Sequence, residues 1–165
     1  MGNYQQSIRR NEAGFTAKEV VVVVVVLVIL SFVVEMTRNW TVVGNFVNPI
    51  ASAVAGQQPG FVYQETLTRT LGSSKPAPGR PITFTVVQPT TAPANSIWIV
   101  SYTDTNGTTT LPGPVTTVNT ISDAKGMVVV YVRSDAIGSG FGLTATDTTP
   151  GCIKCTDTTI FSVTK

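Results

Sequence analysis

Few side chains in this sequence could do catalytic chemistry, and histidine is absent. The chain has 165 residues, with two cysteines, nine acidic side chains and no histidine. Histidine is the side chain whose unperturbed pKa lies near neutrality, so its absence excludes Ser-His, Cys-His and His-metal catalysis. The remaining residues do not combine into a nucleophile, a base and a stabilising group. We therefore expect a protein that is not an enzyme and that needs no cofactor.

The two cysteines form a short motif, Cys152-Ile153-Lys154-Cys155. A c-type haem site would need histidine at the position of Thr156, which excludes haem. A zinc site lacks further ligands in the chain, and a thioredoxin-like site would need a βαβ context. In an exported protein the motif favours a small disulfide ring between Cys152 and Cys155.

Aspartates stand beside several of the expected turns. One interpretation is that they cap turns and aid solubility. The alternative is a calcium site shared by loops at one end of the fold, which would need several converging oxygens. No loop contains a full calcium signature, so both interpretations stay open for residues Asp104, Asp123, Asp135, Asp147 and Asp157.

The composition indicates a surface or secreted β protein with an apolar segment. Hydrophobic residues make up 42% of the chain and charged residues only 12%, which is about half of the usual share. The net charge of +2 comes from 11 basic and 9 acidic side chains. Binding driven by phosphate neutralisation needs a clustered basic face, so nucleic acid is excluded as the main partner.

The apolar segment lies near the N-terminus. Residues 20–34 carry no charge, and residues 20–26 are an unbroken valine run. Counted from Phe15 to Met36, the segment has about twenty residues, roughly the length that crosses a bilayer. Arg9, Arg10 and Lys18 precede it, which favours a cytoplasmic N-terminus and an exported C-terminal part. The sequence thus predicts a transmembrane helix and an inner-membrane precursor.

Glu19 stands at the start of the apolar run. A carboxylate at or below a membrane interface is costly and needs a partner. One interpretation is that Glu19, beside Lys18, is solvated among the headgroups. The other is that it pairs with a positive group from another chain.

The hexapeptide Gly14-Phe15-Thr16-Ala17-Lys18-Glu19, followed by the apolar run, resembles the class III leader of type IV pilins and pseudopilins. The resemblance covers about the first forty residues. It implies that residues 1–14 are a leader cut after Gly14 by a membrane peptidase, that Phe15 is N-methylated, and that Glu19 pairs with the N-terminal amine of a neighbouring subunit. Lys18 and Met36 depart from the family, which usually has an apolar residue and often a proline at these positions.

The pattern beyond the apolar run favours a continued helix. Phe32, Met36, Trp40, Val43 and Val47 recur at spacings of four, four, three and four, which is one face of a helix. Asn48-Pro49 is typical of an interruption or a fresh helix start. We expect a long hydrophobic assembly helix over residues 15–59.

After residue 60 the pattern has period two, which predicts short strands separated by Gly and Pro turns. Such a pattern favours a β-sandwich head over residues 60–165, within an α+β chain. The segment from Ser122 to Thr146 resembles the last hairpin of bacterial Ig-like repeats of invasin type, which implies a spacer or display role. The expected strands are 61–68, 82–88, 97–103, 115–121, 127–133, 141–146 and 159–164.

Together these features predict a structural subunit of a type IV pilus-like extracellular helical filament, with β heads displayed on its surface. The expected partners are identical subunits, the membrane before assembly, the prepilin peptidase and the assembly machinery. Within the family, a minor pilin or a type II secretion pseudopilin is the alternative. From another class, the alternative is a single-span anchored Ig-like adhesin that stays monomeric.

Overall fold

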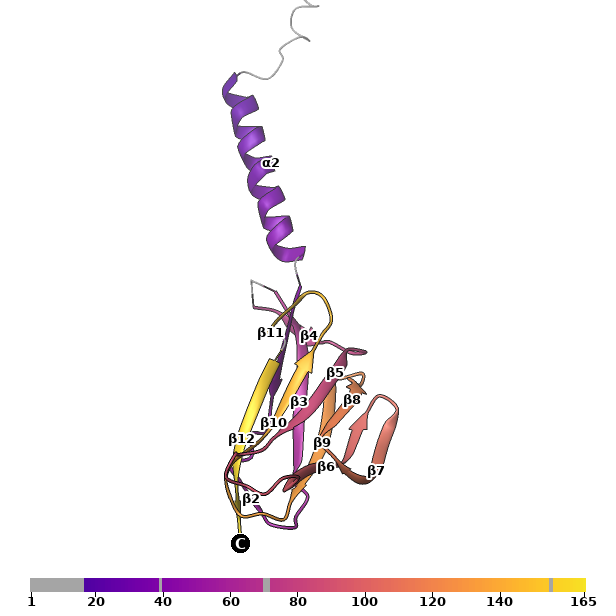
Figure 1. The fold of residues 1–165 in the computed structure, drawn as a ribbon. Coiled ribbons are helices and arrows are strands. Elements are labelled where there is room, and N and C mark those ends of the chain that lie inside the picture. Colours follow the sequence, from indigo (N-terminus) through magenta and orange to yellow (C-terminus); the bar gives the residue numbers. More distant parts are fainter. Residues whose placement is uncertain (1–16, 39, 70–71, 155) are drawn as a thin grey trace, which may run out of the picture. The chain divides into compact units, whose positions relative to one another are not determined.

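The computed structural model describes the chain from residue 17 to residue 165, except residues 39, 70, 71 and 155. The chain divides into two compact units, Met1–Asn39 and Trp40–Lys165. In its described part, the first unit holds the helix α2 (Ala17–Arg38), and the second unit, here called the head, holds strands β1 to β12 (Figure 1).

The prediction of a long helix over residues 15–59 is wrong, and with it the predicted fold class. Helix α2 ends at Arg38, and the chain then forms strands β1 (Thr41–Phe46) and β2 (Ser52–Val54). In β1, Val42 and Phe46 face the core, and the strand pairs antiparallel with β3 from Thr41↔Thr68 to Phe46↔Tyr63. The β-branched run at the start of β1 favours this extended backbone.

Asn48-Pro49 is a connection between strands and not a helix start. The Asn48 side-chain Nδ2 donates to the Gly60 carbonyl at 3.1 Å, and its Oδ1 accepts from the Val62 amide at 2.6 Å. Asn48 thereby ties the segment after β1 to the beginning of β3.

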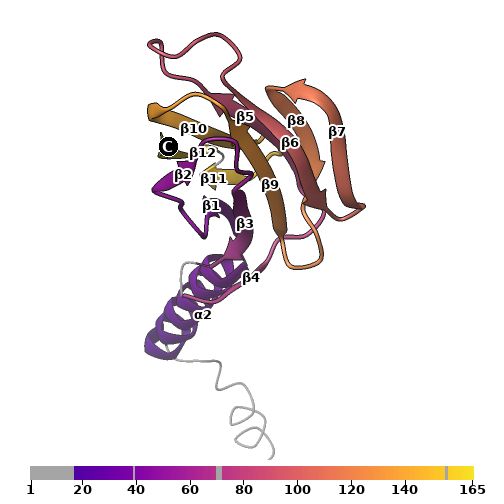
Figure 2. The ribbon, with the colours of Figure 1, turned by 90° about the horizontal axis from the view of Figure 1, so that it is seen from below.

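The head consists of two layered sheets (Figure 2). One sheet has the order β11-β1-β3-β9-β6-β7, with β4 paired to β3, and the other has the order β2-β12-β10-β5-β8. All seven predicted strands correspond to observed ones. The strands not yet placed are β3 (Gly60–Thr68), β4 (Ser74–Pro76), β5 (Pro81–Val87), β6 (Ile97–Asp104), β7 (Gly107–Val115), β8 (Thr117–Ile121), β9 (Met127–Ser134), β10 (Gly138–Asp147), β11 (Cys152–Lys154) and β12 (Thr156–Thr164).

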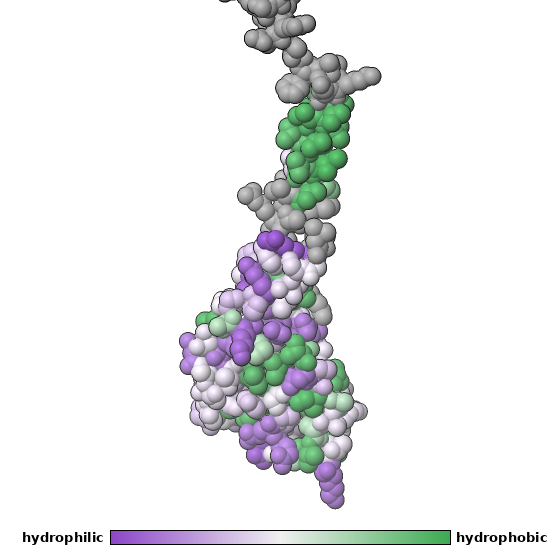
Figure 3. Space-filling model, turned by 180° about the vertical axis from the view of Figure 1, so that it is seen from behind, coloured by the Kyte–Doolittle hydropathy of each residue, from purple (hydrophilic) through white to green (hydrophobic). Residues whose placement is uncertain are grey.

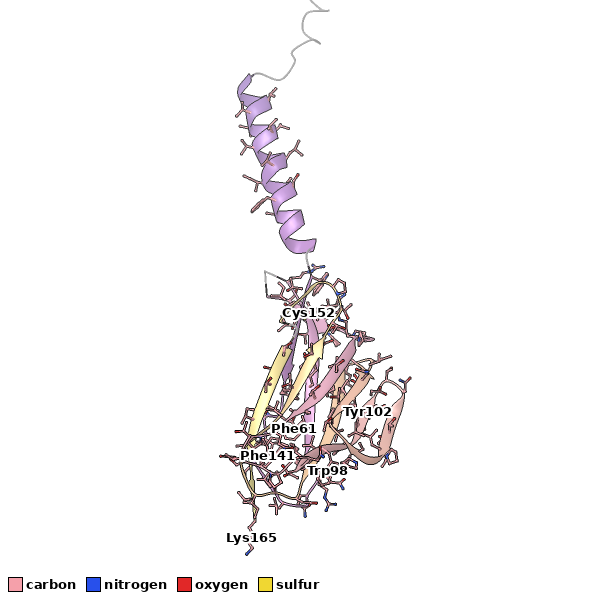
Figure 4. The ribbon with its side chains drawn as sticks, viewed as in Figure 1. Phe61, Trp98, Tyr102, Phe141, Cys152 and Lys165 are labelled. Atoms are coloured by element: carbon pink, nitrogen blue, oxygen red, sulfur yellow. The ribbon has the colours of Figure 1, made fainter. Side chains whose placement is uncertain are left out.

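The core lies between the two sheets and is rich in aromatic rings. Phe61 from one sheet lies 5.0 Å from Phe161 of the other, measured between ring centroids, and Tyr63 lies 5.7 Å from Phe84. Phe61, Phe84 and Phe141 are completely buried. Figure 4 labels Phe61 and Phe141 in this core. The alternation of apolar and polar residues along each strand places these side chains inside.

No helix in the described part of the chain is both long enough and apolar enough to span a bilayer. The predictions of a transmembrane helix and of an inner-membrane precursor are therefore contradicted, as are the pilin and filament terms that rest on such a helix.

Candidate functional site

The predicted site residues lie mostly outside the described residues. This holds for Gly14, Phe15 and Cys155, so leader cleavage, methylation and the disulfide stay predictions. Glu19 has helical backbone within α2, but its side chain is outside the described set. Cys152 begins β11 and is half-buried (Figure 4).

The apolar surface of α2 is the longest run of exposed hydrophobic side chains in the described chain. Every apolar side chain in residues 20–33 is between 45% and 62% exposed. In this segment Ser31 alone is polar, and its Oγ donates to the Leu27 carbonyl at 2.8 Å within the helix. The space-filling view shows the segment in the colour of hydrophobic residues (Figure 3). A helix that is apolar all round is normally buried. An exposed apolar surface of this size is therefore typical of an interaction site.

The head holds a second feature, a buried carboxyl group on β3. Glu65 follows Phe61 and Tyr63 on the inward face of the strand and is completely buried. Neither carboxyl oxygen has a hydrogen-bond partner among the described residues, and the nearest cation, Arg80 Nε, lies 3.8 Å from Oε2. Burial, followed by the charge of Asp147, raises the pKa of Glu65 from 4.5 to about 7, although Arg80 acts in the opposite direction.

Arg80 is bound more closely to Asp147 than to Glu65. Its Nε and Nη2 donate to Asp147 Oδ2 at 2.9 Å and 2.5 Å, and the Thr149 amide donates to Asp147 Oδ1 at 2.7 Å. Burial acts to raise the pKa of Asp147, but the donors from Thr149 and Arg80 outweigh it and lower this pKa. Asp147 therefore carries the charge that Arg80 neutralises, and Glu65 is the member of the cluster whose raised pKa keeps it protonated below about pH 7.

Tyr63 lies on the same inward face of β3 as Glu65 and comes close to Gly44 of β1. Its ring is completely buried, and its hydroxyl has no hydrogen-bond partner among the described residues. A Cβ atom added at Gly44 would lie 1.8 Å from the Tyr63 hydroxyl oxygen, so the glycine on β1 makes room for this group. Burial, followed by the charge of Glu65, raises the pKa of Tyr63 above its ordinary value and keeps it neutral.

The turn-cap interpretation of the aspartates is confirmed for those whose backbone contacts are seen. Asp104 Oδ1 accepts from the Asn106 amide at 2.8 Å, and Asp123 Oδ1 accepts from Lys125 and Met127 at 2.8 Å each. Asp157 differs, because its Oδ2 accepts from the Phe46 amide of β1 at 2.9 Å, which is a contact between strands and not a turn cap. Among the residues that the structure describes, no group of three acidic, Cys or His side chains is placed to hold a metal ion.

The carboxyl cluster was missed in the sequence analysis, although one signal for it exists. The alternation of residues 61, 63 and 65 along β3 places Glu65 on the same face as two core aromatics. Arg80 precedes β5 and Asp147 ends β10, so only the tertiary fold brings them to Glu65.

Comparisons with known proteins do not identify a family. No family model and no curated protein matches the chain. A solved β-glycosidase from Bacteroides vulgatus is similar over 74% of this chain but only 14% of its own length, with 19% identity and a TM-score of 0.47. AvmM, which catalyses macrocyclization in alchivemycin A biosynthesis, is similar over 76% of this chain and 89% of its own, with 8% identity and a TM-score of 0.42.

Both neighbours are enzymes, yet neither likeness bears on the activity of this chain. Their TM-scores lie below 0.5, and this chain corresponds to a small part of the glycosidase. The expectation that the chain is not an enzyme stays a prediction.

Proposed function

We propose that this chain is a structural subunit that self-associates through the apolar surface of α2 and displays its β-sandwich head. The observation that carries the proposal is the exposure of every apolar side chain in residues 20–33. Burying a Val or Leu side chain from full exposure contributes about 1.5–3 kcal/mol. A run of half-exposed side chains therefore offers on the order of 10 kcal/mol before the entropy of association is subtracted.

A second copy of the same helix is the partner that this surface fits. The described side chains of residues 20–33 carry no charge and no polar stripe, so they offer nothing to a charged or strongly polar partner. Helices of this kind pack by interdigitation of apolar side chains. The resemblance of residues 14–19 to a pilin leader implies the same kind of assembly, with Glu19 pairing between subunits.

A matched pair of substitutions tests the proposal. Val26 in α2 and Val47 in the head are 47% and 45% exposed. We expect Val26→Asp to block assembly because it places a charge in the buried helix contact, and Val47→Asp to leave assembly unchanged. Sedimentation velocity of the full chain in detergent-free buffer measures both.

Two results would overturn the proposal. One is a wild-type chain that sediments as a monomer, which is the behaviour of the anchored binding module. The other is a Val26→Asp chain that assembles as the wild type does.

A further inference from the structure

The carboxyl groups of Glu65 and Asp147 lie within hydrogen-bonding reach of each other inside the head. Glu65 belongs to β3 of one sheet, Asp147 ends β10 of the other sheet, and both side chains are buried. Besides burial and the charge of Asp147, a side-chain hydrogen bond with Asp147 raises the pKa of Glu65. Two carboxylates offer only acceptors, so this bond requires a proton on one of them.

The other contacts of the pair decide which residue holds that proton. Asp147 already accepts from the Arg80 guanidinium through Oδ2 and from the Thr149 amide through Oδ1. The Arg80 Nε lies 2.9 Å from Asp147 Oδ2 but 3.8 Å from Glu65 Oε2, and the Glu65 oxygens accept from no donor among the described residues. The negative charge is therefore favoured on Asp147, and the Glu65 O–H donates to Asp147 from one sheet to the other.

No other charged group in the described part of the head competes for this proton. The strand β1 has no charged side chain, and Lys75 and Lys125 of the neighbouring segments are exposed. Tyr63 is the adjacent titratable group on β3, and burial keeps it neutral by raising its pKa. Cys152 and Asp157 act on Tyr63 but are not among the groups that shift the pKa of the buried carboxyl pair.

Arg80 belongs to a short segment whose backbone is bound on both sides. Residues 77–80, here called the 77–80 segment, connect β4 to β5. The Ala77 amide donates to the Glu65 carbonyl at 3.0 Å, and the Ala77 carbonyl accepts from Ser122 Oγ at 2.9 Å. The same Ser122 Oγ accepts from the Arg80 amide at 2.9 Å. The segment therefore contacts the Glu65 backbone at its first residue and the carboxyl pair at its last.

We propose that Glu65 and Asp147 share one proton, and that this proton is a pH-sensitive lock that joins the two sheets and holds the 77–80 segment in place. When Glu65 ionises, two buried carboxylates repel each other and compete for the Arg80 guanidinium. The Arg80 side chain is 17% exposed, whereas those of Glu65 and Asp147 are completely buried, so the rearrangement is easiest for Arg80 and the segment that carries it.

The direction of the switch follows from the pKa of Glu65. This pKa is raised from 4.5 to about 7 in the folded head, so the lock is closed below about pH 7 and opens as the pH rises through this value. The device lies within the head and does not depend on assembly through α2.

Hydrogen–deuterium exchange of the full chain, followed by mass spectrometry, tests the lock. Exchange of the peptide that contains residues 77–80 is compared at about pH 6 and about pH 8.5, after correction for the pH dependence of the intrinsic exchange rate. In the wild-type chain we expect roughly tenfold faster exchange at the higher pH, because the closed form has lost its proton.

Three substitutions separate a shared proton from ordinary packing. Glu65→Gln keeps an N–H donor toward Asp147 at every pH, so the 77–80 segment should stay protected at about pH 8.5. Asp147→Asn removes the repelling charge and leaves Arg80 to pair with an ionised Glu65, so the increase in exchange between the two pH values should disappear. Asp135→Asn changes an exposed ion pair with Arg133, and as the matched control it should behave as the wild type.

Infrared spectroscopy of the wild-type chain gives a second readout that does not depend on a folded variant. A protonated carboxyl group has a C=O stretching band separate from that of carboxylates. Surface carboxyl groups are ionised at about pH 6, so a band at this pH reports a buried acid, and it should be lost at about pH 8.5.

Three results would overturn the inference. They are a wild-type chain without the carboxylic acid band at about pH 6, equal exchange of the 77–80 segment at both pH values, and a folded Glu65→Gln chain that keeps the wild-type increase in exchange. Each of them leaves the proposed assembly through α2 standing, and a chain that fails to assemble leaves the lock standing.

Discussion

Helix α2 and the head differ in the exposure of their apolar side chains. In the head, phenylalanines from both sheets are buried against one another, as in the contact of Phe61 with Phe161. In α2, every apolar side chain of residues 20–33 is exposed. The head therefore buries its aromatic core within one chain, whereas the described apolar side chains of α2 stay exposed.

The largest expected effect separates the two regions by stability. Phe84→Ala empties a completely buried site in the aromatic cluster and should lower the free energy of unfolding of the head by about 3–5 kcal/mol. Val26→Ala in α2 should change it by less than about 0.5 kcal/mol, because that side chain is 47% exposed and does not belong to the core cluster of the head. Denaturant unfolding followed by tryptophan fluorescence measures both, and equal losses would contradict the comparison.

The stability of the head should depend on pH because Glu65 is buried in its interior. The pKa of Glu65 is raised from 4.5 to about 7 by folding, so the folded state binds more protons than the unfolded state between these values. The free energy of unfolding should therefore fall as pH rises from 4.5 to about 7, by on the order of 3 kcal/mol in total.

Glu65→Gln is the control for this pH dependence. It should flatten the decrease between pH 4.5 and about 7, because glutamine does not titrate. It should not change the loss of stability at more acidic pH. That loss comes from protonation of Asp147, whose pKa is lowered in the folded head. Thermal unfolding across pH measures this, and an unchanged profile in Glu65→Gln would contradict the role given to Glu65.

A smaller effect concerns the close approach of β1 to Tyr63. Gly44→Ala places a Cβ atom 1.8 Å from the Tyr63 hydroxyl oxygen and should destabilise the head by about 1–3 kcal/mol. Tyr63→Phe removes that oxygen, so it should recover part of the loss in the double variant. A double-mutant cycle by chemical denaturation measures the coupling, and strict additivity of the two changes would show that the contact is absent.

The smallest expected effect compares two surface aspartates. Asp123→Ala removes the acceptor of two backbone amides, Lys125 and Met127, and should cost about 1 kcal/mol. Asp135→Ala removes only an exposed ion pair with Arg133 and should cost less than about 0.5 kcal/mol. Unfolding midpoints of the two variants measure the difference, and the reverse order would count against the turn-cap assignment.

The sequence was a good guide to the head and a poor one to the chain before it. Strands such as β5 and β9 were predictable because alternation is a local property of the sequence. The strand β1 was missed because Trp40, Val43 and Val47 fit a helical spacing by coincidence. What decides the backbone there is pairing with β3, a contact distant in sequence.

For the candidate sites, too, the sequence predicts local features but not contacts between distant residues. The apolar surface of α2 was visible as a valine run, and its exposure in the single chain follows directly. Glu65 could be placed on an inward face from the alternation of its strand. Its neighbours Arg80 and Asp147 could not be assigned, since they come from other strands and meet it only in the folded head.

The central claim is that the α2 surface becomes buried between copies of the chain, and hydroxyl-radical footprinting tests it most directly. Leu27 in α2 and Ile137 in the head are 57% and 61% exposed in the single chain, so they form a matched pair. In assembled, detergent-free material the account predicts strong protection of Leu27 and continued labelling of Ile137. Labelling of both residues at comparable rates would contradict it.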